Sequence, residues 1–473
     1  MESKEFVFSK ELLEETDVLC LFGFDFIDVQ KQLESWLSLR TKHLFIVQKE
    51  NSYNLEDFWE LAQKNVFQKF SYVISSSLSE SEKSSMEWLF AKCQAIEWNM
   101  HLKASDYQDF GVRVFHNLCS NYTKKAHRKK IDFLKDSLKG IPAFICGGGP
   151  SLREAAPYLQ EIEGKGVVFA GGSALGALSD LSIQFHIATG IDPDPSYERC
   201  LMRGSFESLF FYQDRFSSAL LDQVQGSLFE VPCELGLRLE DSLGFDGGCT
   251  VTTFSAALAV HFGCSPIVFV GMDLSYEDED QKYFQKSAKE DFRVSVIYEE
   301  KFTQKDWVIA AKWLENLANS HSHIPFYNVS QKGLSLEGVQ KISWENLFQE
   351  RKFYLYDIVG RVHALQFLGE EECFVLEERL EKIKNIQKSF ANSLAIIENV
   401  FLLFEKEYPE DPTCNGTYLL HLFALYDEIV YQQLLEPLWK VWRFPIERNL
   451  ESSYEKSIHQ WLFFKKVIQE HLA

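Results

Sequence analysis

The residues best suited to chemistry lie in one turn, where the chain reads Phe-Ile-Cys-Gly-Gly-Gly-Pro-Ser-Leu from position 144 to 152. An apolar strand is expected to end in the glycines. Pro150 suits the first turn of a helix, and the Ser151 hydroxyl is expected to cap that helix. Glycine has no Cβ, so a phosphate or ribose can approach the main chain, and a helix N-terminus offers unpaired N–H groups. The turn therefore predicts a nucleotide-binding site made of Gly147, Gly148, Gly149, Pro150 and Ser151.

Two later turns have a related composition. The turn after the next expected strand contains Gly172 and Ser173, and the serine hydroxyl can hydrogen-bond a ribose or a base. Further along, Gly247, Gly248 and Thr250 precede a helix of small residues, which makes a second glycine-lined helix N-terminus. We expect the two helix N-termini to face each other and to hold the phosphoryl oxygens of one nucleotide.

Three aspartates are the candidate catalytic residues. Asp192 and Asp194 flank a proline after a strand, and two carboxylates on such a turn can share Mg²⁺. The alternative is a charged loop in which Asp192 caps a turn. Asp273 follows another strand, where it either acts on substrate or caps the next segment. Any of the three can accept a proton if burial raises its pKa.

Composition limits the partners. The chain has 473 residues and a net charge of −21, which disfavours nucleic acid and anionic membrane surfaces. Its ten cysteines include no Cys-x-x-Cys pair, so we expect buried free thiols in a reducing compartment. No signal peptide and no membrane span are expected, which predicts a cytoplasmic protein.

The alternation of expected strands and helices predicts an α/β fold in three parts. Residues 1–100 form a small α/β domain with expected strands at 17–25, 43–48 and 70–75. Residues 101–345 form the nucleotide-binding domain, a doubly wound, Rossmann-like sheet that begins with a helical bridge at 101–140. Residues 346–473 carry an apolar seam with helical spacing, which predicts a helical domain and a possible site of homo-oligomerisation.

The motifs of the central region resemble those of the motility accessory factor (Maf) proteins, which share a domain with MptE-like 6-hydroxymethylpterin diphosphokinases. The resemblance rests on residues 147–152, 246–253, 271–276 and 326–330, together with Gly333, and it covers about residues 115–345. The first and third of these segments are also similar to motifs of bacterial sialyltransferases that use CMP-sialic acid.

The resemblance implies roles for particular residues. The turn at 147–151 would hold the ribose and phosphate, Gly247, Gly248 and Thr250 would line the opposite wall, and Asp273 would orient hydroxyls of the sugar or base. Asn328 would lie near the site. Two departures stand out: Gly148 replaces the asparagine of the sialyltransferases, and residues 277–301 lack the histidine that serves them as base.

Three functions remain open at this point. The first is a Maf-like glycosyltransferase that uses a nucleotide-activated sugar of the CMP-nonulosonate class on a hydroxyl of a protein or glycan. The second is an MptE-like diphosphokinase that transfers pyrophosphate from a nucleoside triphosphate with Mg²⁺. The third is a scaffold with a degenerate nucleotide pocket. No organic cofactor is expected for any of them.

Overall fold

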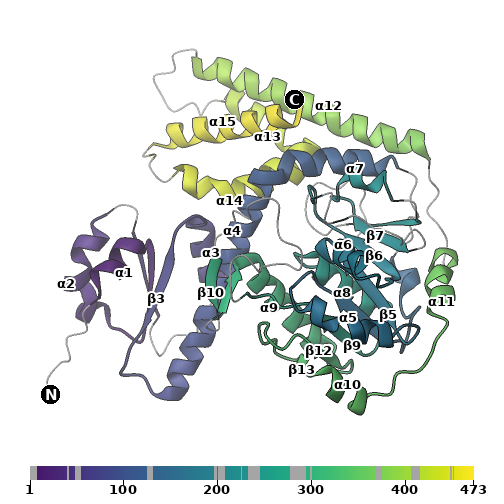
Figure 1. Cartoon of the computed structure of the whole chain (residues 1–473). Coiled ribbons are helices and arrows are strands. Elements are labelled where there is room, and N and C mark those ends of the chain that lie inside the picture. Colours follow the sequence, from purple (N-terminus) through teal and green to yellow (C-terminus); the bar gives the residue numbers. More distant parts are fainter. Residues whose placement is uncertain are drawn as a thin grey trace. The chain divides into compact units, whose positions relative to one another are not determined.

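The protein is described by a computed structural model of the 473-residue chain (Figure 1). The described residues are 8–39, 42–47, 55–124, 131–196, 200, 208–224, 226–232, 245–276, 295–298, 301–368, 375–405, 416–447, 450 and 452–472. They group into two compact units. Unit 1 comprises residues 1–106, 396–427 and 435–467, and unit 2 comprises 107–395, 428–434 and 468–473.

Unit 1 contains a three-stranded parallel sheet in the order β2-β1-β3. Its strands are β1 (Val18–Phe22), β2 (His43–Val47) and β3 (Phe70–Ile74), and its first helices are α1 (Lys10–Glu15), α2 (Phe26–Leu37) and α3 (Leu55–Lys64). Every residue of β1 is buried because helices cover both faces of this central strand. The three strands predicted for the first hundred residues are therefore confirmed.

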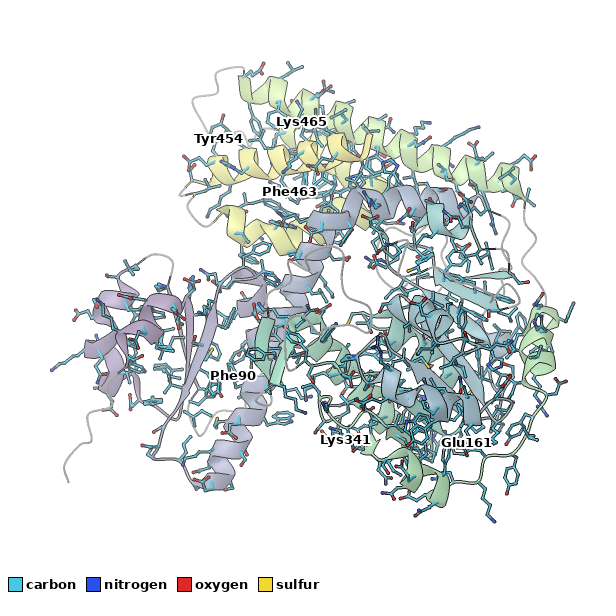
Figure 2. The ribbon with its side chains drawn as sticks, viewed as in Figure 1. Phe90, Glu161, Lys341, Tyr454, Phe463 and Lys465 are labelled. Carbon is cyan, nitrogen blue, oxygen red and sulfur yellow. The ribbon has the colours of Figure 1, made fainter. Side chains whose placement is uncertain are left out.

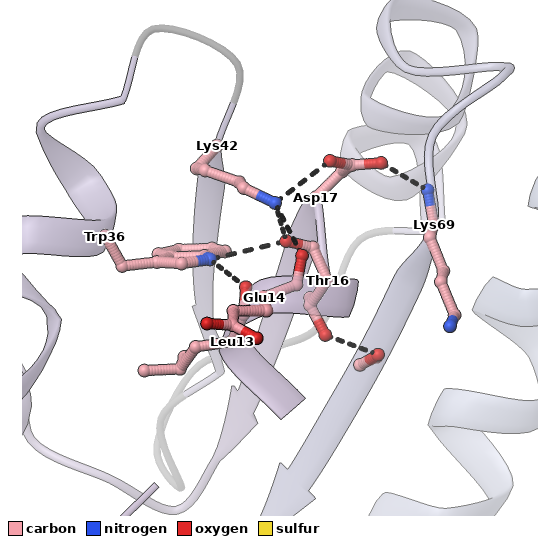
Figure 3. A network of polar contacts seen from close by, with 8 residues as sticks. Leu13, Glu14, Thr16, Asp17, Trp36, Lys42 and Lys69 are labelled. Carbon is pink, nitrogen blue, oxygen red and sulfur yellow. Dashed lines mark hydrogen bonds and ion pairs between the residues drawn. The ribbon is translucent and has the colours of Figure 1, made fainter. Parts of the chain in front are cut away.

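A polar network holds the amino ends of these three strands together (Figure 3). Asp17 accepts hydrogen bonds from Lys42 Nζ at 3.2 Å and from the Lys69 backbone N–H at 3.0 Å. Trp36 of α2 donates its indole N–H to the Leu13 carbonyl at 2.8 Å. The network ties the entry of β1 to both neighbouring strands and to α1, so it is structural.

Helix α4 (Glu80–Tyr122) is 43 residues long and crosses position 100, where the sequence suggested a boundary. Its N-terminal half packs on the small sheet, and Phe90 stacks on Tyr72 with ring centroids 3.6 Å apart (Phe90 is labelled in Figure 2). The predicted bridge at 101–140 is thus helical to Tyr122, and a short 3-10 helix, η1 (Ile131–Leu134), follows. The three-part domain division stays a prediction.

Unit 2 is built on an eight-stranded parallel sheet in the order β13-β12-β9-β4-β5-β6-β7-β8. The strands are β4 (Ala143–Cys146), β5 (Val167–Gly171), β6 (Ile187–Gly190), β7 (Leu209–Gln213), β8 (Leu228–Val231), β9 (Ile267–Val270), β12 (Phe326–Asn328) and β13 (Gln340–Lys341). An antiparallel hairpin of β10 (Ser295–Tyr298) and β11 (Lys301–Gln304) stands outside this sheet. The predicted α/β fold with a doubly wound central sheet is confirmed.

Helices cover both faces of the large sheet. One face packs on α8 (Val251–His261), α9 (Lys305–Ser320) and α11 (Ile358–Ala364), and the other on α5 (Leu152–Glu161), α6 (Ser173–Asp180), α7 (Ser218–Leu221) and α10 (Trp344–Glu350). The strands are apolar on both sides because both faces are buried, as parallel sheets require.

The last part of the chain is helical, as predicted. It comprises η4 (Leu365–Phe367), α12 (Leu376–Glu405), α13 (Gly416–Tyr426), the π-helical turn η6 (Tyr431–Leu435), α14 (Glu436–Glu447) and α15 (Ser453–Leu472). Aromatic side chains dominate the packing within unit 1: Phe463 contacts Trp439, and Lys465 lies over the ring of Phe401 at 5.3 Å (Figure 2). Among the described residues, no helix is long and apolar enough to span a membrane.

Candidate functional site

The strand order of unit 2 creates a topological switch point at the carboxyl ends of β4 and β9. These strands are neighbours, but the chain continues from β4 to β5 on one side and from β9 to β12 on the other. Open parallel sheets bind their ligands at such a switch point. The turns that leave the two strands are the glycine-rich turn at 147–151 and the segment that contains Asp273.

The N–H groups of the glycine-rich turn are mostly paired within the protein. Gly147 and Gly149 donate to the carbonyls of Val270 and Gly271, at 2.8 and 2.9 Å. The Ser151 N–H donates to Asp273 Oδ2 at 3.1 Å, and Pro150 has no N–H to offer. The expected row of free donors is therefore reduced to the N–H of Gly148, which has no partner among the described residues.

Gly148 lies against Ser173, the first residue of α6. A Cβ built on Gly148 would lie 2.0 Å from Ser173 Oγ, so the serine occupies the space that a side chain would need. The hydroxyl of Ser173 has no partner in the described part of the chain and is half-buried. Together the Gly148 N–H and the Ser173 hydroxyl form a pair of adjacent polar groups at the ends of β4 and β5.

The N-terminus of α8 contacts the turn that follows β5. Gly172 has a φ of +53°, and a Cβ built there would lie 3.3 Å from Cγ1 of Val251, the first residue of α8. Thr250 caps α8: its hydroxyl accepts the Thr253 N–H at 3.2 Å, and Thr253 Oγ1 accepts the Thr250 N–H at 3.0 Å. The Thr250 hydroxyl thus stabilises α8 itself. Gly172 brings the turn after β5 against Val251, the first residue of α8.

Side chains already pack on the two glycines before α8. A Cβ on Gly247 would lie 2.7 Å from the Phe254 ring, and one on Gly248 would lie 3.0 Å from Trp313. Trp313 donates its indole N–H to Asp246 at 3.1 Å, and Asp246 also accepts the Gly248 N–H at 2.9 Å. Close packing by aromatic side chains therefore explains these glycines without a ligand.

Asp273 is the buried acid at the switch point, with 5% of its surface exposed. Burial raises its pKa above the usual value, although its hydrogen bonds with Ser151 act in the opposite direction. Its Oδ1 atom is buried and has no hydrogen-bond partner among the described residues, whereas Oδ2 accepts the Ser151 N–H. A carboxyl group in this state can accept a proton from, or donate one to, a bound hydroxyl.

Ser330 completes this cluster, and the sequence analysis gave it no role. Ser151 Oγ and Ser330 Oγ are 2.9 Å apart, so the expectation that the Ser151 hydroxyl caps α5 is wrong. Asn328 accepts the Ser330 N–H at 2.9 Å and donates to the Met272 carbonyl at 3.4 Å. Asn328 thus links β12 to the turn after β9, the turn that contains Asp273.

A loop held by two lysines crosses the backbone of Asp273. A Cβ on Gly333 would lie 2.5 Å from the Asp273 carbonyl oxygen, and the Leu334 N–H donates to that oxygen at 2.9 Å. The Gly333 carbonyl accepts from Lys301 Nζ at 2.6 Å and from Lys341 Nζ at 3.1 Å (Lys341 is labelled in Figure 2). No sequence signal pointed to these lysines, because their partner is a backbone carbonyl.

Asp192 and Asp194 follow β6, two strands away from β4 in the sheet. Both are exposed. Asp192 Oδ1 accepts the Asp194 N–H at 3.0 Å, which is the turn-capping arrangement, and Asp194 forms an ion pair with Arg113. Asn117 of α4 donates to the Pro193 carbonyl at 2.9 Å and fixes the turn between them. This turn can offer oxygen ligands to a cation only in competition with Arg113.

His186 and the cysteines are not among the residues of the candidate site. His186 is buried, accepts the Val168 N–H on Nδ1 at 3.1 Å and has its pKa lowered to about 4 by burial. The seven cysteines within the described ranges are free, and burial raises the pKa of the thiol to about 12 at Cys20, Cys146 and Cys249. Where the chain is described, no three His, Cys, Asp or Glu side chains gather as a metal site.

Comparison with known proteins agrees with the motifs. Residues 116–279 match the sequence model of the family "6-hydroxymethylpterin diphosphokinase MptE-like". The chain is 26% identical over 187 residues to 6-hydroxymethyl-7,8-dihydropterin pyrophosphokinase from Methanocaldococcus jannaschii, a match that covers 37% of this chain and 76% of that protein.

A solved structure shares the fold over most of the chain. The Maf glycosyltransferase from Magnetospirillum magneticum AMB-1 superposes with a TM-score of 0.50 and 12% sequence identity, over 97% of this chain and 79% of that one. The fold and the family match both agree with the resemblance drawn from the motifs. Residues 116–279 are therefore similar to the MptE-like family, in a chain whose fold resembles that of a Maf glycosyltransferase.

Proposed function

We propose that this protein is a glycosyltransferase that moves a sugar from a nucleotide-activated donor, of the CMP-nonulosonate class, to a hydroxyl of a protein or glycan. The comparisons support a transferase in general terms. The observation that carries the proposal is the buried Asp273 carboxyl, whose Oδ1 has no partner in the described part of the chain. It lies at the switch point, on the turn that follows β9.

In the proposed reaction the acceptor oxygen attacks the anomeric carbon of the donor. The bond between that carbon and the phosphate oxygen breaks, and the nucleotide leaves as its phosphate. Asp273 Oδ1 takes the acceptor proton, and a pKa raised by burial brings this base nearer to neutral pH. The N–H of Gly148 and the hydroxyl of Ser173 are the available donors to the departing phosphate.

The fold of the whole chain favours this proposal. The likeness to the Maf glycosyltransferase covers the helical end and the small N-terminal sheet as well as the central domain. A protein acceptor would account for this additional surface. Cytoplasmic location and self-association through the C-terminal helices, where Leu420 and Phe423 are 70% and 59% exposed, are part of the same proposal.

The second candidate is pyrophosphate transfer from a nucleoside triphosphate, which the 26% identity to the archaeal pyrophosphokinase favours. That reaction needs Mg²⁺, and Asp192 with Asp194 is the candidate pair of ligands. The ion pair between Asp194 and Arg113 weighs against it, because a cation at Asp194 would have to displace the guanidinium or share the carboxylate with it.

Thermal unfolding with CMP, CDP, ATP and GTP, each with and without Mg²⁺, separates the two candidates. A ligand that binds the folded state raises the unfolding temperature by mass action. We expect CMP and CDP to stabilise the protein without metal. Stabilisation by a triphosphate that requires Mg²⁺ would favour pyrophosphate transfer instead, and no response to any nucleotide would favour a scaffold.

Release of CMP from a CMP-sugar then tests the base. Asp273→Asn keeps the shape of the side chain but cannot take the proton, so turnover should fall by about 10²-fold or more while CMP still binds. Asp180→Asn, an exposed acid at the end of α6, is the matched control and should retain full activity.

A further inference from the structure

A hollow at the amino end of β12 lies apart from the candidate site at the switch point. It has a volume of about 380 Å³ and is bounded by the end of α9, residues 324–327, Gly338, Gln340 and Arg351. The strands of the sheet are parallel, so the amino end of β12 lies at the edge opposite the switch point. The volume is within the range of small-molecule sites, roughly 300–1,000 Å³.

Arg351, an exposed residue, contacts Tyr327 in two ways at this hollow. Its Nε donates to the Tyr327 hydroxyl at 2.8 Å, and its guanidinium lies 5.5 Å from the centre of the Tyr327 ring. Tyr327 is itself only 3% exposed, so it is a fixed support. The two terminal nitrogens of Arg351 have no partner among the described residues. A guanidinium in this arrangement offers two parallel N–H donors to an oxyanion.

The rest of the lining favours an anion that carries hydroxyl groups. No carboxylate lines the hollow, although the chain has 69 acidic residues against 48 Lys and Arg. The polar side chains there are Asn319, Ser322 and Gln340, and no described residue pairs with them. Their amides and hydroxyl can donate to and accept from sugar-like hydroxyls.

The geometry points to a second ligand site, in which Arg351 binds the carboxylate or phosphate of a small polyhydroxylated anion. The oxyanion takes the two terminal N–H groups of the guanidinium, and Asn319, Ser322 and Gln340 hold the hydroxyls of the ligand. The site is independent of the proposed transferase chemistry, because it shares no residue with the candidate site at the ends of β4 and β9.

Calorimetric titration of the full chain at low ionic strength tests the site with three probes of similar size. Glucose 6-phosphate and glucuronate carry a phosphate and a carboxylate, and glucose carries neither. We expect at least one anion to bind and glucose not to bind. Binding of glucose 6-phosphate alone would identify a phosphate site, and binding of glucuronate alone a carboxylate site.

The variants test the role of Arg351. Arg351→Gln removes the charge and should weaken binding at least tenfold, about what one charge-assisted pair contributes. Arg351→Lys keeps the charge without the fork and should also weaken it, while Tyr327→Phe should weaken it less. Arg361→Gln, an exposed arginine of α11, is the matched control and should bind as the wild type does.

Three results would overturn the inference. They are the absence of binding for both anions, equal binding of glucose, and unchanged binding in Arg351→Gln. Arg351 is exposed, so its variants are expected to fold, and the unfolding temperature of each variant verifies this. Stabilisation of Arg351→Gln by CMP should match the wild type, which keeps this test separate from that of the transferase site.

Discussion

The backbone N–H of Ser151 donates to Asp273 Oδ2 at 3.1 Å, which joins two turns that are 122 positions apart in the sequence. Oδ1 of the same carboxyl is buried, and none of the residues that the structure describes forms a hydrogen bond with it. One oxygen of the carboxyl is thus held by the protein, and in the proposed reaction the other accepts the proton of the acceptor hydroxyl. This asymmetry is what a positioned proton acceptor requires.

Burial of Asp273 predicts a pH dependence of stability. Its folded-state pKa is raised from the usual 3.8, so the folded protein binds the proton more tightly than the unfolded chain does. The stability contributed by the protonated acid is present below pH 3.8 and is lost as the pH rises through the folded-state pKa. We expect Asp273→Asn to lack this loss, so the variant gains stability relative to the wild type as the pH rises.

Urea unfolding of both proteins from pH 3.5 to pH 8 measures this difference. Asp180→Asn, with its exposed acid, should show no such trend. A constant difference between Asp273→Asn and the wild type across the pH range would mean that the Asp273 pKa is not raised.

Contact between Gly148 and Ser173 predicts a specific rescue. A Cβ at position 148 would lie 2.0 Å from Ser173 Oγ and 2.9 Å from Ser173 Cβ, so Gly148→Ala should destabilise unit 2 by about 1–3 kcal/mol. The larger Gly148→Val change would therefore lower the stability of the fold as well as the affinity for the nucleotide. Ser173→Gly removes both clashing atoms.

The double variant Gly148→Ala, Ser173→Gly should regain most of the unfolding free energy lost in the single variant. It should not regain full affinity for CMP, because the Ser173 hydroxyl is gone. Thermal unfolding with and without CMP gives both quantities. Additive losses in the double variant would show that the two residues do not compete for the same space.

Two lysines donate to the Gly333 carbonyl, and we predict that either one can replace the other in stabilising this loop. Lys301 and Lys341 donate to the same oxygen at 2.6 and 3.1 Å, so either one can satisfy it alone. We expect Lys301→Met and Lys341→Met each to have a small effect, below about 1 kcal/mol, and the double variant to lose more than their sum. The loop crosses Asp273, so turnover should fall with stability in the double variant. A double-mutant cycle on unfolding free energy measures the coupling, and strict additivity would contradict it.

The sequence predicted the strands better than the site. Buried parallel strands such as residues 143–146 and 267–270 are short apolar runs between glycine or proline turns, and these are visible in the sequence. The strand at residues 326–328 was not predicted because three residues give no periodicity. The helix from Glu80 to Tyr122 has no proline and one glycine, so nothing in its sequence marks an end at position 100.

The sequence indicated which residue types belong to the candidate site, but it did not predict which of these residues contact one another. Glycine can serve a ligand or a close neighbour, and only coordinates show that Ser173 lies against Gly148, or that Gly147 and Gly149 pair with the turn after β9. Ser330 and Lys301 act on Asp273 or its loop across long sequence separations. Such pairings depend on strand order, which the sequence does not encode locally.

Burial of His186 predicts a second pH effect, of opposite sign to that of Asp273. Its pKa is lowered from 6.5 to about 4, so the folded protein resists protonation of the imidazole. Stability is full above pH 6.5 and falls as the pH drops towards 4, by an amount on the order of 3 kcal/mol. His186→Asn places an amide oxygen where Nδ1 accepts the Val168 N–H, and it cannot gain a charge. We expect loss of the imidazole ring to lower the unfolding free energy of His186→Asn by an amount that does not depend on pH and is smaller than the pH-dependent loss in the wild type. The unfolding free energy of the variant should therefore change less below pH 6.5. Urea unfolding at pH 7, 5.5 and 4.5 compares the two proteins, and parallel profiles would mean that His186 titrates normally.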